Sequence, residues 1–159
     1  MSDFSANEIE GLVLKAARGG GLPTGLGEDL AAAAAFLNLD RLETCPCSSG
    51  AVASIPSALD LVIAGQGPQT VVADPFVIEA YIAVIEAQIG QTVIWVRTPD
   101  GGVFERLDPA VLPDPTPLGR RDIPEPLLIH LKEMGAKMLV PETDASRLAG
   151  AGAGLNDND

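Results

Sequence analysis

The feature that most constrains this chain is a helix whose two ends are both visible in the sequence. Ser5 and Glu8 have the Ser-x-x-Glu spacing of a capping box, in which each side chain satisfies a free backbone N–H at a helix start. Apolar residues recur from Ile9 at helical spacing, and three glycines follow at positions 19–21. Glycine adopts the left-handed conformation at helix ends without steric cost, so this triplet predicts a stop. The sequence therefore predicts a helix over residues 6–18.

A second helix is predicted directly after the first. A turn at 22–25 contains proline and glycine, and Leu30, Ala34 and Leu37 then form an apolar stripe within a helix over about residues 26–39. The short connection predicts that the two helices form an αα-hairpin. Its polar face is neither basic nor aromatic, so we interpret the hairpin as scaffold.

The middle of the chain alternates between breakers and apolar runs. Cysteine, serine, glycine and proline predict a loop over residues 43–56, followed by a short helix at 57–63 that Ser57 would cap. A short strand is expected at 71–73. Proline at a first helical position, followed by isoleucines at steps of four, three and four, predicts a helix over 75–89.

A β-hairpin is predicted next. Its strands cover residues 92–98 and 103–107, and the Pro-Asp-Gly-Gly sequence at 99–102 is typical of a tight turn. Trp95 lies in the middle of the first strand among valines and isoleucine. We therefore expect this tryptophan to pack against the core or a sheet face.

The last third begins with an extended connector. Six prolines fall within residues 109–126, and the arginine pair at 120–121 is the only basic pair there. The pair is predicted to lie in a solvated loop, although an anion clamp is the alternative.

A helix is then predicted over 127–134, with His130 as a structural residue, and a strand over 137–140.

Together these elements predict a single α+β domain over residues 1–159, in which a helical N-terminal hairpin packs with a small, mainly antiparallel sheet. The hydrophobic fraction of 47% is enough for a core, and no uninterrupted apolar run reaches a membrane-spanning length. The formal net charge of −12 opposes binding to nucleic acid and to anionic membranes. No secretory signal precedes the first helix, so a cytoplasmic location is expected.

Metal and cofactor chemistry has little support in the sequence. Cys45 and Cys47 flank one proline, but a structural zinc site needs about four ligands and His130 is the only histidine. A disulfide across a single residue would be strained. Two reduced thiols in a loop are therefore expected, and neither a metal nor a cofactor is predicted.

The two ends of the chain resemble a known family. Residues 139–159, Leu-Val-Pro-Glu-Thr-Asp-Ala-Ser-Arg-Leu-Ala-Gly-Ala-Gly-Ala-Gly-Leu-Asn-Asp-Asn-Asp, resemble the C-terminal signature of a family of uncharacterised bacterial proteins with a domain of unknown function. The stretch from Asn7 to Glu28 is similar to the opening signature of the same family. The resemblance implies a soluble bacterial protein, and it brings no known activity, cofactor or catalytic residue.

The predicted ligand-binding residues lie in the tail, and they are Arg147, Asn156, Asp157, Asn158 and Asp159. The amide and carboxylate oxygens suit hard cations or an amine, and Arg147 can pair with a carboxylate. The preceding alternation of glycine and alanine superficially resembles a phosphate cradle. The negative charge that follows it opposes phosphate, so we reject that reading.

The leading hypothesis is a cytoplasmic binding or accessory protein that recognises a small molecule or a protein partner, with the tail in or near its site. The alternative is an enzyme acting on a small metabolite, with tail carboxylates as acid/base groups or cation ligands. A third reading is a homo-oligomer whose tail reaches into its neighbour. No serine, histidine or carboxylate constellation singles out catalytic residues.

Overall fold

The computed structural model describes residues 3–41 and 50–138; residues 1–2, 42–49 and 139–159 lie outside the described part. The elements follow in the order β1 (Asp3–Phe4), α1 (Ala6–Gly19), α2 (Thr24–Ala34), η1 (Leu39–Arg41), α3 (Ala51–Ile63), β2 (Gln69–Val72), α4 (Pro75–Ile89), β3 (Thr92–Thr98), β4 (Gly101–Asp108), β5 (Arg121–Asp122) and α5 (Glu125–Ala136).

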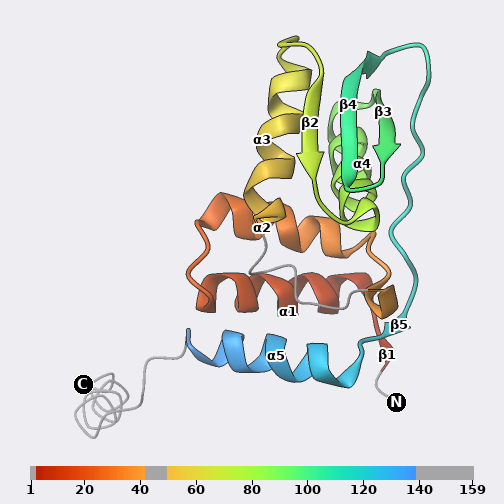
Figure 1. The fold of residues 1–159 in the computed structure, drawn as a ribbon. Coiled ribbons are helices and arrows are strands. Elements are labelled where there is room, and N and C mark those ends of the chain that lie inside the picture. Colours follow the sequence, from red (N-terminus) through yellow and green to blue (C-terminus); the bar gives the residue numbers. More distant parts are fainter. Residues whose placement is uncertain (1–2, 42–49, 139–159) are drawn as a thin grey trace, which may run out of the picture.

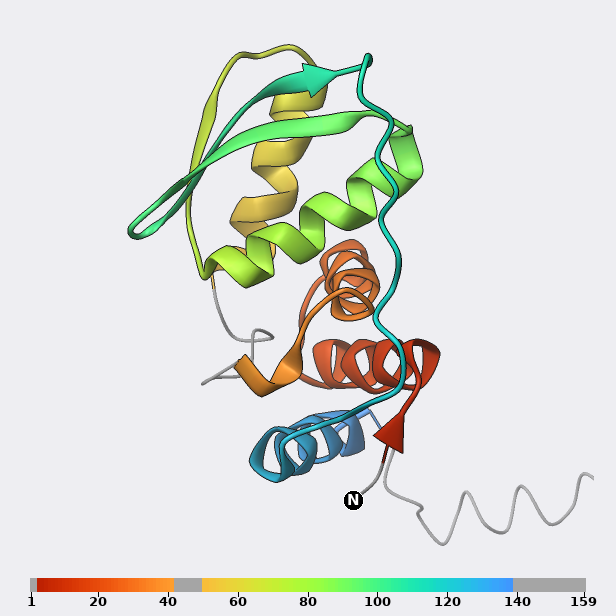
Figure 2. The same ribbon diagram turned by 90° about the vertical axis from the view of Figure 1, so that its right-hand side faces the viewer.

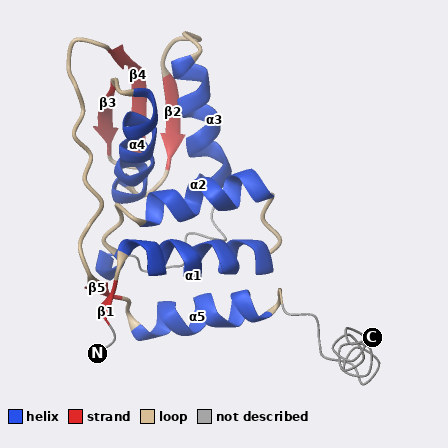
Figure 3. Ribbon diagram, turned by 180° about the vertical axis from the view of Figure 1, so that it is seen from behind, coloured by secondary structure: helices blue, strands red, loops and turns tan. Residues whose placement is uncertain are grey.

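These elements form two stacked parts. In one part α1 lies between α2 and α5, and the three helices run side by side (Figures 1 and 3). In the other part α3 and α4 cover one face of a three-stranded sheet and separate it from α2 (Figure 2). The predicted α+β class, with a helical hairpin and small antiparallel sheets, is confirmed.

The three-stranded sheet has the order β2-β4-β3, and both pairings are antiparallel. The predicted hairpin is confirmed, since β3 and β4 are joined by Pro99 and Asp100 alone. Trp95 pairs with Phe104, whose side chain is fully buried, and the indole packs against the core. A second, two-stranded sheet pairs β1 with β5 and so joins the start of the chain to the end of the proline-rich connector.

The ends of α1 follow the sequence signals closely. The Oε2 atom of Glu8 accepts a hydrogen bond from the Ser5 N–H at 2.8 Å, and the Ser5 hydroxyl oxygen accepts one from the Glu8 N–H at 3.4 Å. These bonds hold the pKa of Glu8 below its usual range, with the Ser5 backbone bond as the largest cause. At the other end Gly21 has a φ of 83°, and the Leu22 N–H donates to the Ala17 carbonyl at 3.0 Å. The predicted capping box and glycine stop are confirmed.

The second helix is shorter than predicted. α2 ends at Ala34 instead of running to residue 39, and the chain then turns through Ala35 and Phe36. The guanidinium of Arg121 donates to the carbonyls of Ala34 and Ala35, at 2.5 and 3.2 Å, and so satisfies the last turn of the helix. A contact with a residue more than 80 positions away therefore sets this boundary.

The third helix begins earlier than predicted. α3 starts at Ala51, so the predicted loop is wrong over 51–56. Pro56 lies inside the helix and removes one backbone hydrogen bond. Burial of Val52 and Ile55 offsets that loss. Ser57 does not cap the helix; its hydroxyl donates to the Ala53 carbonyl at 2.8 Å within the helix.

The last described helix is longer than predicted. α5 continues through Gly135 to Ala136, where the sequence had suggested a stop and then a strand. The N–H groups of Lys137 and Met138 donate to the carbonyls of Met134 and Gly135, at 3.1 and 3.2 Å. The strand prediction is wrong for these two residues, because their N–H groups are already used by the helix end. The rest of that predicted strand lies outside the described residues.

The backbones of α1 and α5 approach closely where the two helices end. A Cβ atom placed on Gly19 would lie 1.8 Å from the carbonyl oxygen of Met134, so only glycine fits there. Gly135 similarly lies against Lys15. The C-terminal ends of α1 and α5 are thus in direct contact.

Candidate functional site

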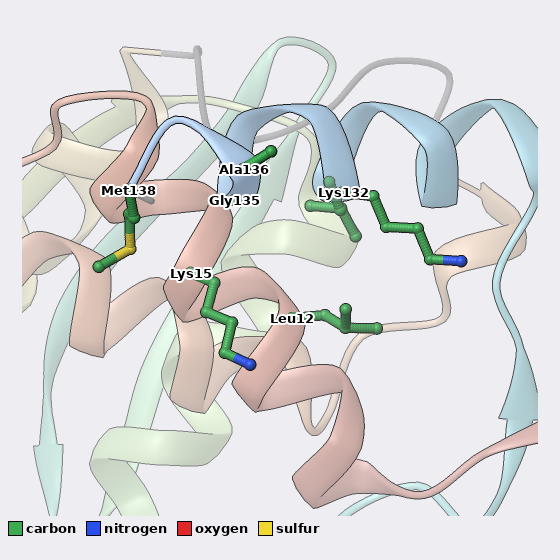
Figure 4. Close-up of a pocket in the computed structure, with 7 residues that line it drawn as sticks. Leu12, Lys15, Lys132, Gly135, Ala136 and Met138 are labelled. Atoms are coloured by element: carbon green, nitrogen blue, oxygen red, sulfur yellow. The ribbon is translucent and has the colours of Figure 1, made fainter. Parts of the chain in front are cut away.

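α1 and α5 run in the same direction and leave an open groove of about 430 Å³ between them (Figure 4). It is lined by Leu12, Lys15, Leu131, Lys132, Gly135, Ala136 and Met138. Met138, the last described residue of the chain, is one of these lining residues.

Most of the lining is apolar. Leu131 is buried at 2% exposure and Leu12 is half-buried, while Met138 remains 43% exposed at the end of α5. Gly135 contributes no side chain, which keeps the space between the helices open. The groove can therefore accept an apolar group without rearrangement of these helices.

The cations beside this groove are its most unusual property. The chain has three lysines, Lys15, Lys132 and Lys137, and all three are exposed. Two of them line the groove, and Figure 4 shows Lys15 extending from α1 and Lys132 from α5. Lys137 lies between two lining residues, and its Nζ atom is 3.2 Å from the sulfur of Met134. Every lysine of an acidic chain is therefore at or beside one apolar groove.

The described arginines behave differently from the lysines. Ion pairs join Arg18 to Glu28 at 3.4 Å, Arg97 to Glu79 at 4.0 Å, Arg106 to Asp108 at 3.9 Å, and Arg120 to Asp3 at 3.0 Å. Across residues 3–41 and 50–138, no lysine has a carboxylate within ion-pair distance. The groove thus presents ammonium groups that the described carboxylates do not neutralise.

Arg120 lies in a largely exposed loop, as predicted, whereas Arg121 is half-buried in β5, and both side chains bind groups of the protein itself. Arg121 is half-buried and uses its guanidinium on the carbonyls at the end of α2 and on those of Leu118 and Gly119, both at 3.1 Å. This burial lowers the pKa of Arg121. Arg120 donates to the carboxylate and the backbone carbonyl of Asp3. Both residues fasten the connector to the N-terminal helices.

The sequence-predicted site lies outside the described residues. This applies to Arg147, Asn156, Asp157, Asn158 and Asp159, and also to Cys45 and Cys47. The tail site therefore stays a prediction. Met138, the residue that precedes this segment, lines the groove.

The described part of the chain gives little support for a catalytic histidine, a metal site or a membrane-spanning helix. His130 is half-buried on α5, and its Nε2 atom has no hydrogen-bond partner there. No group of three or more histidine, cysteine, aspartate or glutamate residues within 3–41 and 50–138 could hold a metal ion. Among the helices described, none has the length and apolarity needed to cross a membrane.

Sequence reasoning missed the groove. It predicted the helices over residues 6–18 and 127–134 separately and did not place them side by side. The groove exists only because α1 and α5, which are more than 100 residues apart in sequence, lie side by side. One signal was available: lysine occurs only at positions 15, 132 and 137.

The fold and the groove define an α+β protein with an open, lysine-rimmed surface between two helices. Over residues 4–46 the chain matches the model of a family described as "Protein of unknown function (DUF3726)". The matched segment contains α1 and α2, so the predicted resemblance to a domain of unknown function is confirmed there. No curated protein and no solved structure matches this chain.

Proposed function

We propose that this is a cytoplasmic binding or accessory protein that holds an acidic, amphipathic segment of a protein partner in the groove between α1 and α5. The observation behind the proposal is the gathering of all three lysines of a chain with net charge −12 around one apolar groove. None of these lysines has a carboxylate partner in residues 3–41 and 50–138.

The two kinds of lining residue suggest what the partner segment contains. Apolar side chains would bury against Leu12 and Leu131, and burial supplies most of the affinity at roughly 25 cal/mol per Å² of apolar surface. Carboxylates would pair with Lys15 and Lys132. Exposed ion pairs of this kind contribute only about 0.2–1 kcal/mol each, so the lysines mainly orient the segment and speed its association.

The shape of the groove favours a protein segment over a small molecule. The groove is open along two parallel helices, and an amphipathic segment laid in such a groove is a recurrent mode of recognition. Small-molecule sites usually enclose most of the surface of their ligand. An open surface suits a partner that continues beyond the groove at both ends.

The predicted tail site would lie near this groove. Residues 139–159 follow directly from Met138, so Arg147 and the run from Asn156 to Asp159 are tethered to the groove. The homo-oligomer reading also remains a proposal, with a second copy as the source of a tail. The enzyme alternative depends on the same tail carboxylates and stays a prediction.

A titration followed by NMR tests the proposal. A synthetic helical peptide of leucine and glutamate should shift amide signals of Leu12, Lys15 and Lys132 in the isotope-labelled full chain. Lys15→Glu combined with Lys132→Glu should weaken binding by about tenfold or more, since two attractive pairs become repulsive. Arg106→Glu is the control for a charge reversal away from the groove, because Arg106 lies on β4 with 65% of its side chain exposed. It should leave the affinity unchanged.

Two results would contradict the proposal. Equal binding of a leucine and lysine peptide would remove the role of the groove cations. Saturable binding of dodecanoate at the same residues, with no binding of the acidic peptide, would make the groove a small-molecule site.

A further inference from the structure

We propose that the resident occupant of the groove is the chain's own segment 139–159, which a partner has to displace. This inference rests on the proposed function, because it takes the groove between α1 and α5 as the binding site. It adds a form of regulation to that site.

The segment has the composition that the groove selects. Its carboxylate side chains are Glu142, Asp144, Asp157 and Asp159, against a single cationic side chain, Arg147. Its larger apolar side chains are Leu139, Val140, Leu148 and Leu155. It is therefore an acidic segment with spaced apolar anchors, and it has the charge opposite to that of the lysines around the groove.

The connection to α5 makes occupancy favourable even for a weak contact. Met138 lines the groove and is the residue from which the segment continues. Covalent connection to a nearby site raises the effective concentration of a segment into the millimolar range. An intrinsic dissociation constant of about 0.1 mM, weak between separate molecules at micromolar concentration, would then be enough to fill about nine-tenths of the groove.

The anchor that fits best is Leu155 together with Asp157 and Asp159. Leu155 is followed by four polar residues, so an apolar group and two carboxylates occur within five positions. The glycines at 150, 152 and 154 remove Cβ contacts and permit the backbone to reverse toward the groove. In this arrangement Leu155 would occupy the space beside Leu12, and the carboxylates would face Lys15 and Lys132.

Occupancy by the tail lowers the apparent affinity for a partner. The apparent dissociation constant rises as the fraction of open groove falls, so nine-tenths occupancy weakens binding about tenfold. A partner with a stronger apolar anchor would displace the tail and free it. The tail would thus select against weakly matched partners.

A spin label tests the intramolecular contact directly, without any partner. In full-length chain carrying Cys45→Ser and Cys47→Ser, a nitroxide at Ala151→Cys should broaden the amide signals of Leu12, Lys15 and Lys132. Leu155→Ser should reduce this broadening at least twofold, whereas Ala153→Ser, the control substitution in the same segment, should preserve it. Broadening spread evenly over the chain would overturn the inference. So would broadening that appears equally when labelled and isotope-enriched molecules are separate copies.

A second measurement separates this inference from the proposed function. The acidic leucine and glutamate peptide should bind about tenfold more tightly to full-length chain carrying Leu155→Ser, Asp157→Asn and Asp159→Asn than to the unaltered chain. Equal affinities would overturn the tail inference while the proposed function stands. Broadening at the groove without peptide binding to either chain would overturn the proposed function while the intramolecular contact stands.

Discussion

Arg121 shows how one side chain joins parts of the chain that lie far apart in sequence. Its guanidinium carries several donors in a fixed plane, and it reaches the carbonyls of Ala34 and Ala35 as well as those of its own connector. The sequence shows only an arginine in a proline-rich stretch. The partners are backbone atoms that any residue would supply, so no side-chain pattern could have predicted them.

We predict that Arg121→Ala destabilises the protein markedly. The substitution removes the side-chain donor from the carbonyls of Ala34 and Ala35, which keep only the backbone bonds from Leu37 and Leu118. It should lower the free energy of unfolding by about 1–3 kcal/mol. Arg121→Lys should recover only part of this loss, because one ammonium cannot reproduce the planar set of donors. Urea unfolding followed by circular dichroism measures both variants.

Arg106→Ala is the control for this experiment. The Arg106 side chain is 65% exposed and pairs with Asp108 at only 3.9 Å, so its loss should change stability by less than about 0.5 kcal/mol. If Arg121→Ala and Arg106→Ala changed the free energy of unfolding equally, the hydrogen bonds from Arg121 to the end of α2 would not stabilise the protein.

At the scale of elements, the predictions succeeded where the determining contacts are local. α1 and α4 have their caps and stops in adjacent residues, and the turn between β3 and β4 is local too. The end of α2 and the start of α3 were wrong because a distant arginine sets the first and the burial of Val52 and Ile55 supports the second. The groove was missed for the same reason, since its two walls come from opposite ends of the described chain.

Two glycines in α1 provide a matched test of how this helix packs. An added Cβ meets nothing within 4 Å at Gly11, but it would lie 1.8 Å from the Met134 carbonyl oxygen at Gly19. Gly11→Ala should therefore stabilise the protein by about 0.5–1 kcal/mol through helix propensity. Gly19→Ala should destabilise it by about 1–3 kcal/mol, because α1 and α5 must move apart.

Thermal or urea unfolding of the two single variants decides this point. If both substitutions stabilise the protein, the close contact between α1 and α5 is wrong, and so is the groove that depends on it.

At the scale of the whole molecule, one cluster of buried side chains runs through both stacked parts. It includes Ile9 and Leu131 in the three-helix part, Leu59 and Ile78 in the helices under the sheet, and Phe104 in the sheet itself. The sequence-based expectation of a single domain over the full chain remains a prediction. A shared core leads us to expect that both parts unfold together.

The single tryptophan makes this expectation measurable. Trp95 fluorescence reports on the sheet, whereas far-ultraviolet circular dichroism reports mainly on the helices. The two urea transitions should have the same midpoint within error. Separate midpoints would show that the helical part and the sheet part are independent units.

The position of α5 beside α1 has a consequence for how this protein is made. α1 leaves the ribosome before α5, and Leu131, which packs in the same buried cluster, is translated more than 100 residues after α1. At about 5–20 residues per second, one side of α1 stays uncovered for roughly 5–20 s during translation. The nascent chain therefore exposes an apolar helix face to chaperones and to neighbouring nascent chains throughout that interval. Translation speed through the sheet region sets how long this exposure lasts.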